Sequence, residues 1–432
     1  MVLSAYTQHA LMWGIFALSY IGIALGRFPG LVLDRTGVAI LGAIGMLLVH
    51  GVSISQAAAL VDHETMLLLF ALMIFSAQLR VAGFYGVTGQ LLTRLTQRPR
   101  TLLAGLIVTS GLLSSLLAND IVCLALTPLL CSTLLAAGRN PLPYLLALAM
   151  SSNIGSAATI IGNPQNMYIG AVADLSFGHF TLIMLPVVVF GLGLCWVGVV
   201  LLFRKELHAP ASTGGAKMHF RDGDTLVPTS LTLETRPPER DDYLIAKSLV
   251  LLAGLVGVFL FARGEGRAIA ALVGAGILLC SRRAKAARLY RLVDWNLILL
   301  FLGLFVINGA MQQQGLADRA LAEVAGRGLD LRQPVTLATV TLVLSNLVSN
   351  VPAVLLLKPV IPMADQQLWY LLALVSTLAG NLTLVGSIAN LIVAESAAAY
   401  GVRLDLRAYC RLGIPLTLVT VGAAAAWLIW VL

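Results

Sequence analysis

Two short stretches of the sequence place amide and hydroxyl side chains inside strongly apolar surroundings. Residues 153–166 read NIGSAATIIGNPQN between YLLALAM and MYIGAVA, and residues 377–390 read TLAGNLTLVGSIAN. Gly162 and Pro164 oppose a continuous helix, because proline lacks the amide hydrogen and clashes with the preceding turn, at a cost of ~3 kcal/mol. A helix broken there offers free amide donors to an anion and free carbonyls to a cation. The pattern predicts a solute or ion site.

The side chains of both stretches add the donors and acceptors that such a site needs. The candidate residues of the first stretch are Asn153, Thr159, Gly162, Asn163 and Asn166, and those of the second are Asn381, Thr383, Gly386, Ser387 and Asn390, with Thr377 beside them. With these partners the unpaired backbone becomes a binding site instead of an uncompensated cost. The alternative is structural, because small and polar residues also join helices within membranes.

Two further apolar segments, 105–135 and 336–362, are interrupted near their middle by polar residues. The first break holds Asn119 and Asp120, and the second holds Ser349 and Asn350. Such a break is typical of a re-entrant hairpin, which a bilayer permits only where the bend is buried in protein or lines a water-filled cavity. We expect both tips to lie opposite the broken helices and to complete the solute site.

Asp120 is the candidate carrier of a coupling proton. A carboxylate in hydrocarbon costs at least ~2.5 kcal/mol, so an ionisable residue at this depth is a functional candidate. Because burial disfavours the charged form, Asp120 could take up and release a proton as the site changes sides. It could equally stay charged and bind Na+, or serve only as a cap of a hairpin helix.

The elements that position these residues are predicted to be membrane-spanning helices. Hydrophobic residues make up 59% of the 432 residues and charged residues 11%, against about 25% charged residues in ordinary globular proteins. A crossing needs ~20 helical residues, and apolar runs of about this length recur at 10–26, 37–53, 64–82, 178–203, 244–262, 294–313 and 411–431. We therefore expect an all-α polytopic membrane protein. Since the basic residues gather in loops, the net charge of +8 indicates membrane topology and no nucleic-acid partner.

The two halves of the chain follow one plan. VDHETMLLLFALMIFSAQLRVAGF (61–84) aligns with VDWNLILLFLGLFVINGAMQQQGL (293–316) at an offset of 232. SSLLANDIVCLALTPLL aligns with SNLVSNVPAVLLLKPVI at 231, and SAATIIGNPQN with GNLTLVGSIAN at 224. Loop 54–63 has no Lys or Arg, whereas its counterpart 282–291 has five. Because basic loops face the cytoplasm, the repeats are predicted to be inverted, as in many secondary transporters.

This pattern predicts five crossings in each half, ten in all, with one re-entrant hairpin and one broken helix per half. The first repeat covers residues 1–203 and the second, inverted repeat covers 244–432. Residues 204–243 between them are polar and rich in proline, which is typical of a flexible cytoplasmic linker. Both termini are then expected outside the cell, with the protein in the plasma (inner) membrane.

Four motifs, LLANDIVCLALTP, TIIGNPQNMYI, LVSNVPAVLLL and GNLTLVGSIANLIVAE, resemble the ion-transporter superfamily over nearly the whole chain. That superfamily includes arsenite efflux membrane subunits, citrate and divalent-anion sodium symporters, and a group of inner-membrane permeases. In the sodium-coupled dicarboxylate branch both hairpin tips look like Ser-Asn-Thr, and neither tip here completes that motif. The Asn119–Asp120 pair is closer to arsenite pumps. The resemblance implies elevator-type or rocking exchange of a small anionic or oxyanion-like solute.

The sequence thus predicts a secondary-active transporter, best described as proton-coupled arsenite or antimonite efflux with Asp120 carrying the proton. The alternative on the same fold is sodium-coupled uptake of citrate, a dicarboxylate or sulfate, and a passive channel would share the hairpins. An enzyme is not expected, because the chain has no HExxH motif, no GxSxG with a partnered His and no metal-ligand set. Beyond the solute, H+ or Na+ as coupling ion and the bilayer, a homodimer and a cytoplasmic ATPase subunit stay open as partners.

Overall fold

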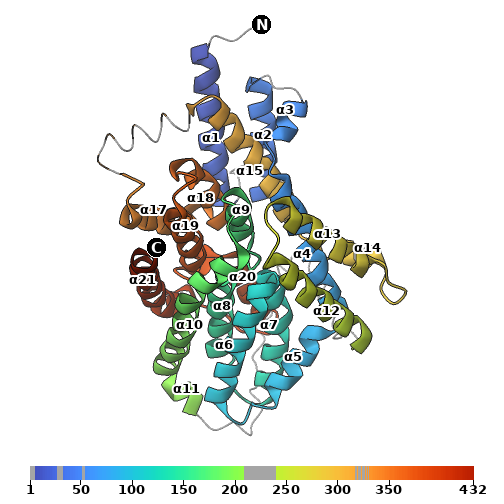
Figure 1. Cartoon of the computed structure of the whole chain (residues 1–432). Helices are drawn as coiled ribbons and strands as arrows, with labels where there is room; N and C mark the ends of the chain where they lie inside the picture. Colours follow the sequence, from blue (N-terminus) through green and yellow to red (C-terminus); the bar gives the residue numbers. More distant parts are fainter. Residues whose placement is uncertain are drawn as a thin grey trace.

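Helices form every regular element of the residues that the computed structural model describes, namely 5–26, 33–50, 54–208, 240–316 and 330–432 with Arg319, Glu323, Gly326 and Gly328. Figure 1 shows their arrangement. The first part contains α1 (Ala5–Leu25), α2 (Arg35–His50), α3 (Ile54–Ala59), α4 (His63–Val81), α5 (Phe84–Thr93), α6 (Pro99–Leu116), α7 (Asn119–Ala136), α8 (Leu142–Ser156), α9 (Pro164–Val172), α10 (Phe177–Leu202) and α11 (Arg204–His208). The second contains α12 (Asp242–Phe259), α13 (Glu265–Leu279), α14 (Ala286–Tyr290), α15 (Trp295–Gln313), α17 (Pro334–Val348), α18 (Asn350–Leu357), η1 (Lys358–Val360), α19 (Gln366–Ala379), η2 (Leu384–Gly386), α20 (Ile388–Ala398) and α21 (Leu406–Val431).

Eight of the described helices are long and apolar enough to cross a membrane, namely α1, α4, α6, α7, α10, α12, α15 and α21. Large apolar side chains such as Leu182, Leu201 and Val250 are exposed on their outer faces, as lipid-facing residues are. The chain is therefore a polytopic membrane protein. These eight helices differ from the ten predicted crossings, which include the shorter α2 and α13 and both broken helices. Conversely, α6 and α7 were predicted as hairpin arms, but each has 18 residues and measures about 27 Å.

The aligned halves place matching residues at matching helix ends. Asp62 caps α4 by accepting a hydrogen bond from the Thr65 amide at 2.8 Å, and Asp294 caps α15 through the Leu297 amide at 3.0 Å. Beyond the other ends of these two helices, Gly83 and Gly315 adopt left-handed φ angles of 80° and 63°, which glycine adopts without steric cost. The cap at the start of the helix and the glycine after its end are thus both repeated at the offset of 232.

Helices of one half pack on helices of the other. Helix α2 lies along α15, and α13 lies along α4 (Figure 1). A side chain added at Gly42 would come within 2.9 Å of Ile307, and one added at Gly274 within 2.7 Å of Phe75. Gly274 lies 232 residues after Gly42, and Ile307 lies 232 residues after Phe75. The close approach of small residues is therefore repeated at the same offset.

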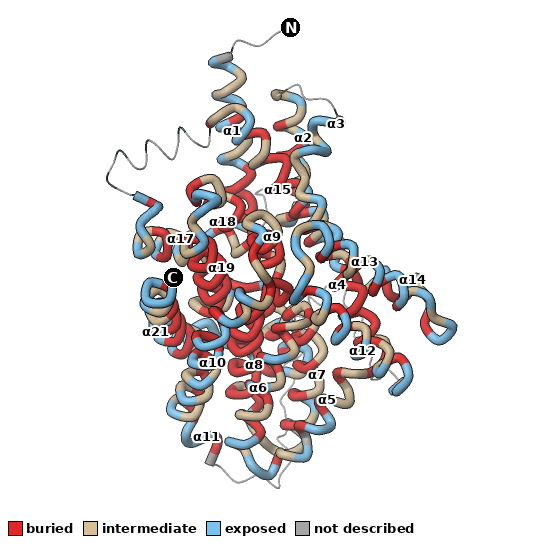
Figure 2. Tube along the Cα trace, viewed as in Figure 1, coloured by how far each residue is buried: buried red, intermediate tan, exposed pale blue. Residues whose placement is uncertain are grey.

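The most deeply buried helices are α8 and α19. Figure 2 shows both as almost continuous buried segments, and 14 of the 15 residues of α8 are buried. A helix that is apolar and buried on every side is surrounded by other helices. The two helices that lead into the predicted breaks therefore occupy the centre of the protein.

Gly155 lets α8 approach α6, and a Cβ atom at this position would lie 2.2 Å from the Gly111 carbonyl oxygen. Because backbone atoms cannot move aside as a flexible side chain does, Gly155→Ala is expected to cost several kcal/mol, above the ~1–3 kcal/mol typical of overpacking. Thermal melting followed by size-exclusion chromatography measures the loss. Gly193→Ala is the matched control, because nothing lies within 4 Å of its added Cβ; equal melting temperatures for both variants would contradict the predicted close approach.

Most of the predicted linker, residues 209–239, lies outside the described residues. Within its expected bounds of 204 and 243, Arg204–His208 form α11 and α12 begins at Asp242. Asp241 caps α12 by accepting a hydrogen bond from the Leu244 amide at 3.1 Å. Its carboxylate also binds the Arg283 guanidinium at 3.2 Å.

The Leu244 amide, and after it Arg283, lower the pKa of Asp241 below the ordinary 3.8. A lowered folded pKa contributes stability above the unfolded pKa, and this stability is lost as the pH falls through the folded value. Asp241→Asn is therefore expected to lower the melting temperature at pH 7. The difference from the wild type should begin to shrink near the ordinary pKa of about 3.9 and should disappear only below the lowered folded pKa. Melting curves between pH 3 and pH 8 measure it; a difference that grows toward acid would contradict the stabilisation of the charged carboxylate by the Leu244 amide and Arg283.

Candidate functional site

Both predicted helix breaks are present. Helix α8 ends at Ser156 and α9 begins at Pro164, while α19 ends at Ala379 and α20 begins at Ile388 after the short η2. Asn163 caps α9 by accepting a hydrogen bond from the Asn166 amide at 2.9 Å. Proline follows at the first position of α9, where its missing amide hydrogen costs nothing.

The two breaks meet, and Asn153 is the centre of their contact. Its Nδ2 donates to Asn381 Oδ1 at 2.9 Å and to Asn390 Oδ1 at 3.0 Å. Its Oδ1 accepts from Ser387 Oγ at 3.0 Å and from Asn119 Nδ2 at 3.2 Å. One buried amide of the first half thus binds the second broken helix and its own hairpin tip. We call this contact and the one around Thr377, described next, the polar junction.

Thr377 is the second centre of the polar junction. Its hydroxyl accepts hydrogen bonds from Asn163 Nδ2 at 3.1 Å and from Gln165 Nε2 at 3.3 Å, and it lies 3.4 Å from Asn166 Oδ1. The hydroxyl also donates to the Ala373 carbonyl at 2.9 Å. These contacts bring the start of α9 against the end of α19.

The bonds around the two centres correspond at the offset of 224. Asn153 is equivalent to Thr377, and each binds the other half's equivalent of Asn166 or Asn390. Ser387 bonds to Asn153 as Asn163 bonds to Thr377. Side chains at equivalent positions therefore make equivalent contacts across the junction, as two elements related by a two-fold axis would.

Asn166 and Asn390 hold the unwound turns in shape. Asn166 Nδ2 donates to the Thr159 carbonyl at 3.2 Å, and Asn390 Nδ2 donates to the Thr383 carbonyl at 3.3 Å and to that of Gly380 at 2.8 Å. Their amides satisfy carbonyls that a broken helix leaves without a partner.

Other predicted residues of the turns face the hairpin arms. The Thr159 hydroxyl binds the Ser115 carbonyl on α6, and the Thr383 hydroxyl binds Asn346 Oδ1 on α17 at 3.1 Å. Gly162 lies against the Ser156 carbonyl oxygen, and an added Cβ would be 2.1 Å from it; a Cβ added at Gly386 would be 2.7 Å from Asn346 Oδ1. These positions shape the turns and are one step away from the Asn153 contact.

The two hairpin tips differ. At the first tip the Ala118 amide lies 3.4 Å from Ser76 Oγ on α4, and Asn119 binds Asn153. Asp120 is half-buried in the first turn of α7. Among the hydrogen bonds and ion pairs of the described residues, none involves the Asp120 carboxylate.

At the second tip Ser349 has φ 78° and ψ 161°, a combination that is essentially restricted to glycine and costs about 1–3 kcal/mol. Asn350 Oδ1 is buried, and no hydrogen-bond partner for it exists within the described part of the chain. Its Nδ2 lies beside Gly380, 3.3 Å from an added Cβ. The second tip thus reaches the second unwound turn, but it is not bonded to it as Asn119 is bonded to Asn153.

Two contributors to the site were not predicted, Gln165 and Asn346. Asn346 supports Thr383 and also donates to the Ala379 carbonyl at 3.0 Å. Asn346 lies in α17, whereas Asn350 begins α18 beyond the break at Ser349, so their spacing of four gave no helical signal. Gln165 follows Pro164 directly, and only the approach of α19 gives its side chain a partner.

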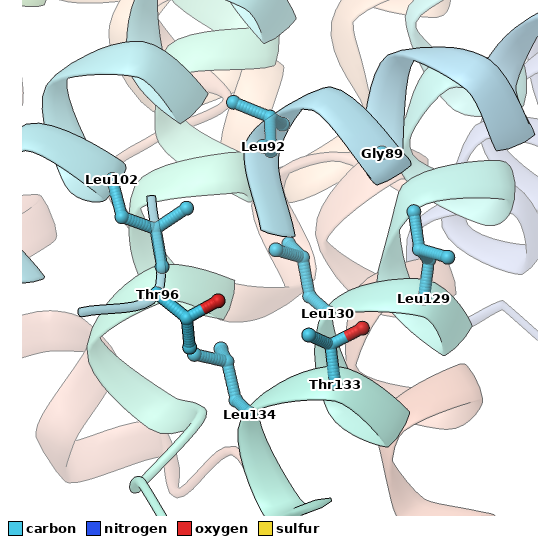
Figure 3. Close-up of a pocket in the computed structure, with 8 residues that line it drawn as sticks. All are labelled: Gly89, Leu92, Thr96, Leu102, Leu129, Leu130, Thr133 and Leu134. Atoms are coloured by element: carbon cyan, nitrogen blue, oxygen red, sulfur yellow. The ribbon is translucent and has the colours of Figure 1, made fainter. Parts of the chain in front are cut away.

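The pocket of Figure 3 lies away from the polar junction, between α5, α6 and α7. Leucines line most of it, with Thr96 and Thr133 as its polar residues. It carries neither an amide nor a charge to recognise a solute, so the polar junction is the better candidate. There the hydrogen bonds of the described residues join only amides, hydroxyls and backbone groups.

Discontinuous helices that meet in a buried polar junction inside a polytopic helical protein are typical of secondary transporters. A family model described as a citrate transporter matches residues 20–379. The chain belongs to this citrate transporter family, and it is accordingly a secondary transporter and not an enzyme.

Individual relatives agree with this assignment, and one solved structure shares the fold. The chain is 32% identical to the silicon efflux transporter LSI3 of Oryza sativa subsp. japonica, covering 85% of this chain and 86% of the relative. It is 26% identical to the putative transporter arsB of Dictyostelium discoideum, covering 94% and 89%. The crystal structure of the Alcanivorax borkumensis YdaH transporter covers 99% of this chain and 98% of its own with a TM-score of 0.53. At 14% identity, this last likeness concerns the fold alone.

Proposed function

We propose that the protein exports a small inorganic oxyanion or its neutral acid, with arsenite or antimonite as the first choice, in exchange for protons. The observation that carries this proposal is the chemistry of the polar junction, which consists of amides and hydroxyls. A trivalent arsenic hydroxide is uncharged at pH 7 and binds through hydrogen bonds alone. It would replace bonds that the junction side chains make with one another.

Citrate and dicarboxylates require a different site. Burying a carboxylate without a paired cation costs several kcal/mol. The hydrogen bonds of the described junction residues involve no charged side chain. Lys358 lies at the end of α18 beside Gln312, 3.5 Å from its Oε1, and not at the junction. The family description nevertheless makes citrate the second candidate, with Na+ as the coupling ion.

Asp120 is proposed as the coupling residue. It adjoins Asn119, which binds Asn153, and no described cation neutralises it. A half-buried carboxylate without a counter-ion favours the protonated form, so proton uptake and release there can accompany a change of access.

We further propose that residues 1–203 and 244–432 are inverted repeats with both termini outside the cell. The equivalent bonds at the offset of 224 and the packing of α2 and α13 on the other half support it. The basic loop 282–291 and the uncharged loop 54–63 support opposite orientations. A relative named for silicon efflux supports outward transport of a small inorganic solute.

Transport by the purified protein in proteoliposomes tests this function. Arsenite, antimonite, silicate, citrate, succinate and sulfate are offered under an imposed proton or sodium gradient. We expect accumulation of arsenite or antimonite against its gradient when protons move the opposite way. Sodium-driven citrate uptake would replace the first candidate by the second, and flux that persists after both gradients collapse would indicate a channel.

A further inference from the structure

A buried arginine outside the polar junction holds the far end of α9. Arg267 of α13 is 1% exposed, and its guanidinium donates to the Leu175 carbonyl at 2.8 Å and to the Gly170 carbonyl at 2.9 Å. Glu64 at the start of α4 lies 3.5 Å from it. Carbonyls at a helix C-terminus lack partners within the helix and carry partial negative charge. Arg267 therefore joins the end of α9 to both α4 and α13.

Asp174 completes this cluster in a backbone conformation that disfavours a side chain. Its φ is 42°, whereas the residue in the same position after α20 is Gly401, with φ 74°. The amides of Asp174 and Gly401 bond alike, to Ala171 at 3.3 Å and to Ala398 at 2.9 Å. Glycine adopts this region freely, so the side chain of Asp174 needs another explanation. Its carboxylate accepts from the Gly264 amide at 3.2 Å and lies 3.7 Å from Arg267.

The symmetry-related position contains the arginine but neither acid. At the offset of 232, Arg267 corresponds to Arg35 and Glu64 corresponds to Asn296. Asn296 offers its backbone carbonyl to Thr36 at 3.1 Å. With Gly401 in place of Asp174, both carboxylates that accompany Arg267 are missing around Arg35. Among the described residues, the cluster is therefore present at one end of the protein and not at the other.

We propose that Arg267 is a positioning residue that clamps the C-terminal end of α9, and that the described part of the chain supplies no such clamp for α20. Because α9 is short and rigid, holding Gly170 and Leu175 also directs its opposite end, which carries Asn163 and Asn166 at the junction. Removing one partner of a buried charged cluster is strongly destabilising locally. Helix α20 then moves more readily than α9, so access to the junction opens first at the end where α20 terminates. This inference depends on the geometry of α9 and not on which solute is carried.

Hydrogen exchange of the full-length protein in nanodiscs, without solute, tests the clamp. In Arg267→Gln the amides of 165–176 are expected to exchange about tenfold faster or more, since exchange reports local opening. Arg35→Gln is the matched control and should leave the amides of 389–402 within about twofold of the wild type. Arg267→Lys should behave as an intermediate, because one ammonium cannot bind two carbonyls in a fixed fork. Unchanged exchange in 165–176, or equal acceleration in both segments, would overturn the proposal.

Asp174→Gly separates the clamp from backbone strain and serves if Arg267→Gln does not fold. Relief of the left-handed strain alone would slow exchange in 165–176 or leave it unchanged. The clamp requires faster exchange there, despite the relaxed backbone. In the transport assay, faster exchange should accompany a higher KM with a smaller change in maximal rate. Because exchange is measured without solute, failure of arsenite transport would count against the proposed function and not against the clamp.

Discussion

Replacing Asp120 with Asn is expected to abolish proton-driven accumulation of the solute. The amide has nearly the size of the carboxylic acid but cannot release a proton, so the two fluxes lose their thermodynamic link. An imposed gradient of one pH unit is worth about 1.4 kcal/mol, or about tenfold in the accumulation ratio per coupled proton, and this factor should be lost. Counterflow exchange without a proton gradient should persist, because Asn119 and Asn153 are unchanged.

The measurement for Asp120→Asn is uptake into proteoliposomes with and without an imposed pH gradient, on protein with a normal melting temperature. Asp34→Asn is a useful control, since this carboxylate accepts a hydrogen bond from the Gly37 amide in the first turn of α2 and is exposed. Asparagine also caps helices, so proton-driven flux should survive there. Undiminished driven flux in Asp120→Asn would exclude Asp120 as the coupling residue.

Replacing Asn153 with Ala is expected to have the largest effect on the junction itself. Four hydrogen bonds disappear, leaving Asn381, Asn390, Ser387 and Asn119 each short of a partner. A buried polar group left unpaired costs about 1–3 kcal/mol. Because every 1.4 kcal/mol is a factor of ten, solute affinity should fall by about 100-fold or more, and the melting temperature should fall as well.

Asn153→Thr combined with Thr377→Asn gives this prediction its sharpest control. The two residues are equivalent at the offset of 224, and each binds the equivalent of Asn166 in the opposite half. If the junction is built symmetrically, the exchanged pair should recover part of the affinity that each single variant loses. Binding measured by thermal shift with arsenite checks it. If the double variant loses as much affinity as the two single variants together, the two residues do not have equivalent roles.

Helix breaks and helix ends could be predicted because their causes are local. Pro164 and Asn163 end one helix and begin another whatever surrounds them, and Asp62 and Asp294 cap helices through amides three residues away. The repeat offsets then located the second copy of each feature. Helix lengths were less predictable, since α6 and α7 continue to span length and exceed the expected hairpin arms.

The sequence by itself determined that the chain is an apolar helical membrane protein with two polar interruptions in related halves, because composition, proline and repeat spacing act along the chain. Only the tertiary structure decided which atoms meet. Asn153 bonds to Asn390 at a separation of 237 residues, and Arg267 reaches carbonyls 92 and 97 residues away. Such pairs depend on how helices pack in three dimensions, where a buried polar group must take whichever partner the neighbouring helix brings within reach.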